Sequence, residues 1–168
     1  MKLISQRLVL LFMIVYSMNS CSTDADETAK VDNVVNEKVI SYTYNALELE
    51  TMEKINTYRV SIGRNRLEKI NYISVKSEEH NNYMIANNVV NHNDFVARSE
   101  NIMNILGAKT VSENIAYNFN TSQSVLTAWL ASPSHKNNIE GNFTHFGLAI
   151  KENPVNGRKY FTNIFAKI

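Results

Sequence analysis

The sequence contains one cysteine, Cys21, among its 168 residues. A single cysteine in an exported chain cannot form an internal disulfide, so its thiol is free, joined to another molecule or modified. The chain beyond Cys21 therefore has no disulfide. Hydrophobic packing alone must hold it together.

Runs of one charge are also missing. The chain has 17 Lys and Arg residues against 16 Asp and Glu residues, and no basic stripe with interleaved aromatic residues occurs. We therefore expect no nucleic-acid partner. No internal repeat or low-complexity tract is visible, and the length lies in the range of roughly 100–200 residues typical of one domain.

Residues 1–20 predict a secretory signal peptide. Lys2 and Arg7 are followed by an apolar stretch over residues 8–16, which is shorter than the ~20 residues that a membrane-spanning helix needs. A charged segment followed by a short apolar one is typical of export signals. We expect the protein to be exported and exclude these residues from the fold.

The position of Cys21 indicates lipidation. Cys21 stands just beyond the apolar stretch, and Ser20 is the small residue that precedes the modified cysteine in bacterial lipoproteins. Met18 replaces the usual Leu of that pattern, and Asn19 is larger than expected. We predict that Cys21 anchors the protein to the lipid bilayer of a bacterial cell envelope. The alternative is a plain cleaved signal peptide in which Cys21 is incidental.

The mixed, polar residues 21–46 predict a tether that carries the lipidated cysteine. A weak apolar patch at residues 39–42 near its end could pack on the body as an edge strand. The body itself is predicted over residues 47–168, where helical periodicity begins.

Periodicity and turn residues predict helices first and strands mainly late in the body. The first predicted helix starts at residue 47 and stops at Gly63. Further helices are predicted over residues 74–90, 95–106, a segment capped by Thr121 or Ser122, and 135–140. Strands are predicted over residues 111–117, 143–151 and 158–168, the last two forming a hairpin. This order favours an α+β fold.

Several short motifs resemble the bacterial branch of the CAP superfamily, the fold shared by cysteine-rich secretory, antigen 5 and pathogenesis-related proteins. They are INTYR at 55–59, HN at 92–93, SENIA at 112–116, WLASPSH at 129–135, FG at 146–147 and YFTNIF at 160–165. The resemblance implies an α-β-α sandwich in which helices cover both faces of a central antiparallel sheet.

The resemblance also implies a cleft lined by His92, Glu113 and His135. Eukaryotic members have a second glutamate three residues after the tryptophan, where this chain has Ser132. We list Ser132 with the other three as a ligand-binding candidate. His92, Glu113 and His135 are also the catalytic candidates.

Two imidazoles and a carboxylate allow more than one chemistry. His92 and His135 could bind Zn²⁺ or another divalent cation, with Glu113 as a third ligand and one position left for water. The same trio could position a water molecule by general-base action. It could instead only stabilise the fold, and no H-E-x-x-H motif decides between these possibilities.

Other candidates have simpler interpretations. We expect His80 to lie on the inward face of its helix, His145 on a sheet surface and Trp129 in the core. A serine next to His135 invites a nucleophile interpretation, but Ser132 followed by proline is also a common helix start.

The favoured function is a binding module of the cell envelope whose cleft takes a lipid, cell-wall or protein ligand. The alternative is a peptidase-like hydrolase that uses metal or water. We prefer binding because a fold confers no activity by itself and no nucleophile beside a base is evident.

Overall fold

The computed structural model describes residues 40–168. The predicted signal peptide, Cys21 and most of the predicted tether lie outside the described residues. In chain order the elements are α1 (Ala46–Ser61), β1 (Glu68–Lys69), α2 (Asn71–Asn87), α3 (Phe95–Leu106), β2 (Thr110–Tyr117), α4 (Ser122–Ala131), α5 (Pro133–Ile139), β3 (His145–Glu152) and β4 (Lys159–Lys167).

The strands form one sheet in the order β1-β3-β4-β2. Strands β2, β3 and β4 pair antiparallel, with β4 between the other two. This confirms the predicted α+β fold. The two-residue β1 is an addition to the prediction, because it pairs parallel to β3 and is too short to show any alternation.

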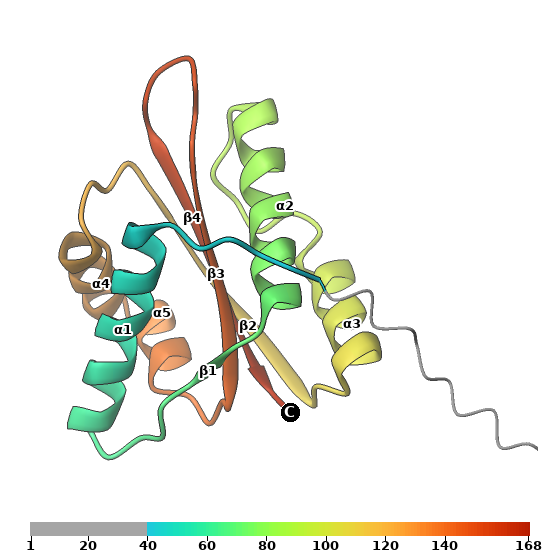
Figure 1. Ribbon diagram of the computed structural model, residues 1–168, viewed down its shortest axis with the longest axis vertical. Coiled ribbons are helices and arrows are strands. Elements are labelled where there is room, and N and C mark those ends of the chain that lie inside the picture. Colours follow the sequence, from blue (N-terminus) through green and yellow to red (C-terminus); the bar gives the residue numbers. More distant parts are fainter. Residues whose placement is uncertain (1–39) are drawn as a thin grey trace, which may run out of the picture. The chain divides into compact units, whose positions relative to one another are not determined.

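Helices cover both faces of the sheet (Figure 1), with α1, α4 and α5 on one face and α2 and α3 on the other. The alternation of β4 explains this arrangement. Phe161 and Phe165 join the larger apolar cluster under α1, α4 and α5. Ile164 and Ala166 join the cluster under α2 and α3.

Local signals account for most helix ends. Asn45 and Glu48 form a reciprocal capping box at the start of α1, and Thr121 caps α4. Helix α3 has the predicted bounds and ends at Gly107, whose φ of 67° suits a left-handed cap. Helix α2 is shifted toward the N-terminus relative to the prediction, because Asn88 takes the left-handed conformation and ends it.

Helix α2 packs closely on β3 at Gly147. A Cβ atom built on Gly147 would lie 2.3 Å from the main-chain nitrogen of Ser74. Only a residue without a side chain fits there.

Contacts with the domain begin before α1. Residues 40–45 form no strand, so the edge-strand alternative for the apolar patch is wrong for its described part. The Tyr42 hydroxyl donates to Glu48 Oε1 at 2.8 Å, and the Tyr44 hydroxyl lies 2.9 Å from Ser74 Oγ. No helix within residues 40–168 is long and apolar enough to cross a membrane.

Candidate functional site

Strand β2 places Glu113 on the sheet face that α2 and α3 cover. Side chains alternate along a strand, and Ile115, two residues on, packs with Met84 of α2. Ala116, with the opposite orientation, packs in the cluster under α1, α4 and α5. Glu113 therefore points into the layer between the sheet and α2 and α3, where it is buried.

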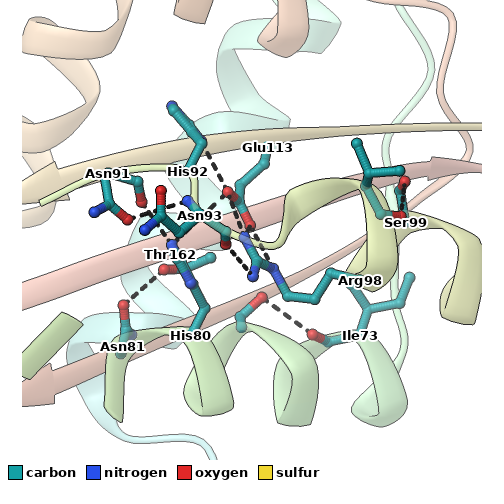
Figure 2. A network of polar contacts seen from close by, with 12 residues as sticks. Ile73, His80, Asn81, Asn91, His92, Asn93, Arg98, Ser99, Glu113 and Thr162 are labelled. Carbon is teal, nitrogen blue, oxygen red and sulfur yellow. Dashed lines mark hydrogen bonds and ion pairs between the residues drawn. The ribbon is translucent and has the colours of Figure 1, made fainter. Parts of the chain in front are cut away.

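The Glu113 carboxylate is bound on both oxygens. Arg98 of α3 donates from Nε to Oε2 at 3.0 Å and from Nη2 to both oxygens, at 3.0 and 2.9 Å. His92 Nδ1 lies 2.8 Å from Glu113 Oε1. Figure 2 shows these groups converging on one carboxylate. Glu113 and Arg98 form a buried, charge-assisted pair, the stronger kind of hydrogen-bonded contact.

His80 of α2 is buried beside the cluster of Glu113, Arg98 and His92. It is buried as predicted, and its Nε2 lies 2.8 Å from the main-chain oxygen of Asn91 and 3.9 Å from Glu113 Oε1. Its ring stacks on Tyr83. Burial lowers the pKa of the His80 imidazole below its ordinary value, and the nearby Glu113 carboxylate only partly opposes this effect.

The loop between α2 and α3 carries His92 and is held from both sides. His80 binds the oxygen of Asn91, and Arg98 Nη1 donates to the oxygen of Asn93 at 2.9 Å. The Asn93 amide donates to the Tyr83 hydroxyl at 2.8 Å. His92 is therefore fixed at its backbone, while its side chain is 47% exposed.

His135 lies near the start of α5, which packs against the edge strand β2. Its backbone is held where α5 begins, because Asn114 Nδ2 donates to the His135 oxygen at 3.0 Å. Asn138 Nδ2 donates to Asn114 Oδ1 at 2.8 Å and ties α5 to β2 again. Burial lowers the pKa of His135, and so does the charge that His92 can carry. Among residues 40–168 no hydrogen bond joins the His135 side chain to His92 or Glu113.

The two serines near His135 have a structural explanation. Ser132 immediately precedes α5, Pro133 occupies its first position, and the Ser132 oxygen accepts from Lys136 N at 2.9 Å. The hydroxyls of Ser132 and Ser134 lie 3.3 Å apart. Among residues 40–168 no hydrogen bond joins either hydroxyl to His135, so neither of these two serines is paired with that histidine.

Sequence reasoning missed Arg98. A usable signal was present, since Ile102 is the buried residue of α3 and Arg98 lies four positions before it. Residues four apart share one helix face, so Arg98 had to point toward the sheet. The helical pattern did not indicate which residue Arg98 would contact. His145, in contrast, is where it was predicted, on β3 at the sheet surface, 3.8 Å from Glu68 Oε2.

The donor set at this site is limited. In the part of the chain that the structure describes, no group of three or more His, Cys, Asp or Glu side chains is arranged to hold a metal ion. The oxygens of Glu113 already accept from Arg98 and His92.

The domain is thus an α-β-α sandwich with a four-stranded sheet between two helical layers. A histidine and a glutamate are paired beside its edge strand. Residues 52–165 match the model of the CAP family, described as the cysteine-rich secretory protein family. The match covers more than half of the chain. The protein belongs to the CAP family.

Solved bacterial proteins share this fold. An outer surface protein from Borrelia burgdorferi has a TM-score of 0.62 and 21% identity, and the match covers 69% of this chain and 88% of that one. An extracellular protein containing an SCP domain from Bacillus anthracis has a TM-score of 0.60 and 21% identity, with coverages of 76% and 45%. A cysteine-rich secretory protein from Staphylococcus aureus has a TM-score of 0.58 and 17% identity, with coverages of 73% and 39%.

No curated protein matches the chain at a significant level.

Proposed function

We propose that this protein is a binding module of the bacterial cell envelope, with His92 and His135 as its ligand-contacting residues. The observation that carries the proposal is the hydrogen bonding of the Glu113 carboxylate. Both of its carboxylate oxygens accept hydrogen bonds from Arg98 or His92. The carboxylate is a fixed part of the domain that orients a partly exposed histidine.

The same observation argues against the hydrolase alternative. A general base must be within hydrogen-bond reach of the water that it activates. The Glu113 side chain is only 1% exposed and is already bonded to Arg98. Peptide hydrolysis through Glu113 would require breaking that ion pair.

The ligand is expected to be a lipid, a cell-wall component or a protein, as the predicted envelope location allows. The test is binding of residues 22–168, which lack the predicted signal peptide and Cys21, to phosphatidylglycerol vesicles and to purified peptidoglycan, measured by sedimentation. Replacing His92 and His135 together by Ala should abolish the interaction. His145→Ala is the matched control, because this histidine pairs with Glu68 instead.

Two results would contradict the binding module. Binding to both surfaces that is unchanged in the double variant would remove the histidines from the ligand site. Peptide cleavage by the parent that disappears in the double variant would favour the hydrolase.

Cation binding is a second candidate function, supported by the exposed imidazole of His92. Histidine nitrogens suit Zn²⁺, and a carboxylate bonded to the other ring nitrogen is the usual partner of a metal-binding histidine. Glu113 has that relation to His92. We expect calorimetry to detect Zn²⁺ binding at neutral pH that weakens below about pH 6.5, because a protonated imidazole cannot bind metal. Equal affinity in the double His→Ala variant would refute this site.

The anchor is proposed from Cys21, which lies outside the described residues. Two similar structures belong to an outer surface protein and an extracellular protein, which agrees with an exported domain. The full-length protein should fractionate with membranes and incorporate labelled fatty acid, and Cys21→Ala should do neither. Release of the unmodified protein as a soluble, unacylated form would end the lipoprotein proposal.

A further inference from the structure

The protonation state of Glu113 follows from its contacts. Its carboxylate is buried and receives three N–H···O contacts from the Arg98 guanidinium, which is always charged. Both oxygens therefore accept from a permanent cation, which is the charge-assisted arrangement of a carboxylate with a guanidinium. An ionised carboxylate only accepts hydrogen bonds.

The tautomer of His92 follows in turn. His92 Nδ1 lies 2.8 Å from Glu113 Oε1. Since the oxygen cannot donate, Nδ1 must carry the hydrogen. In the neutral ring Nε2 then has a free lone pair. The half-exposed side chain makes that lone pair available to a ligand.

His80 takes the opposite tautomer for a similar reason. Its Nε2 lies 2.8 Å from the main-chain oxygen of Asn91, and a carbonyl oxygen only accepts. Nε2 of His80 therefore carries the hydrogen. Nδ1 of the same ring is buried without a hydrogen-bond partner, which is consistent with an unprotonated nitrogen. His80 thus holds the residue just before His92 in place.

We propose that Arg98 is the positioning residue of His92. Through Glu113 it keeps His92 in the Nδ1–H tautomer, and through the oxygen of Asn93 it fixes the loop on which His92 lies (Figure 2). His92 consequently presents Nε2 as a lone-pair donor. A group that pairs with it must offer a hydrogen-bond donor or be a cation such as Zn²⁺.

This inference deepens the proposed function and rests on it only for the role of Nε2 in ligand contact. The tautomer itself can be tested without any ligand. Arg98→Gln removes the guanidinium that holds both Glu113 oxygens and the Asn93 oxygen. Glu113 and the loop are then free to change orientation, so His92 Nδ1 need no longer face Glu113 and both tautomers of His92 become accessible.

The primary measurement is nitrogen NMR of the histidine side chains in the full chain at neutral pH, with His92 assigned by its loss in His92→Gln. We expect a protonated Nδ1 and an unprotonated Nε2 in the parent, and a mixture in Arg98→Gln. Arg98→Lys, which keeps the charge, should restore much of the parent signal. Arg64→Gln is the matched control, because this arginine is exposed.

A parent in which His92 carries its hydrogen on Nε2 while Nδ1 is unprotonated would overturn the proposal, and this result needs no variant to fold. A pure Nδ1–H signal in folded Arg98→Gln would also overturn it, since Arg98 would then be unnecessary.

Zn²⁺ alone provides a second measurement. Loss of a group that orients a metal-binding histidine lowers affinity by about 10–100-fold, so we expect that loss in Arg98→Gln and a smaller one in Arg98→Lys. Zn²⁺ affinity in Arg98→Gln equal to that of the parent would count against the positioning role. A parent that binds no Zn²⁺ would refute the cation site, while the tautomer measurement would still decide the role of Arg98.

Discussion

Trp129 provides a direct test of how the domain is held together, because no disulfide is available within residues 40–168. Its side chain is 1% exposed and belongs to the apolar cluster between the sheet and the α1, α4 and α5 layer. Its indole Nε1 also donates to the Ile115 oxygen of β2 at 2.9 Å. Trp129 therefore contributes both packing and a hydrogen bond that ties α4 to the edge strand.

Two substitutions separate these contributions. Trp129→Ala removes both, and large-to-small changes of a buried aromatic residue cost about 3–5 kcal/mol. Trp129→Phe keeps an aromatic ring but leaves the Ile115 oxygen without its donor, a loss of about 1–3 kcal/mol. The Phe variant should thus lie between the parent and the Ala variant in free energy of unfolding.

The assay is urea unfolding followed by far-ultraviolet circular dichroism. Fluorescence is unsuitable because Trp129 is the sole tryptophan. Val96→Ala is the control, since Val96 is 69% exposed and its loss should change stability by no more than about 0.5 kcal/mol. A Trp129→Ala variant as stable as this control would refute the assignment of Trp129 to the core.

Three further predictions follow from buried positions. Gly147→Ala should destabilise the domain by about 1–3 kcal/mol, the range for overpacking, because the new Cβ would meet the backbone of Ser74; unchanged urea midpoints would contradict this close approach. Burial lowers the folded-state pKa of His80 and His135, so the unfolded chain binds more protons as the pH falls below about 6.5. Stability should therefore decrease from pH 7.5 to 5, with a weaker decrease in His80→Gln; a pH dependence identical in the two proteins would remove His80 as a cause. Arg59 is fully buried and donates to the main-chain oxygens of Ile139, the last residue of α5, and of Gly141 beyond it. Arg59→Lys should therefore lower the free energy of unfolding by about 2 kcal/mol, and a loss below about 0.5 kcal/mol in denaturant titrations would contradict that role.

Local patterns were sufficient for most of the architecture. The period of residues 95–106 and the glycine after them predicted α3 with its bounds, and the alternation on both sides of a turn predicted the β3-β4 hairpin. The periodic signal also placed Trp129 and His80 inward. These features depend on the chain within a few residues, where periodicity and capping act.

Short or unusual elements escaped the same reasoning. Strand β1 has two residues, and its pairing depends on main-chain bonds to Thr144 and Phe146 far along the chain. The contacts of Tyr42 and Tyr44 with the domain likewise depend on how the segment before α1 packs on the domain.

The family motifs in the sequence were enough to name His92, Glu113 and His135 as one group. The sequence by itself also determined that the domain lacks disulfides. Tertiary structure alone decided that Arg98 meets Glu113 and that Glu113 faces Nδ1 of His92. The physical reason is that periodicity assigns a side chain to one face of its own helix or strand, whereas its partner is set by how elements distant in the chain pack together.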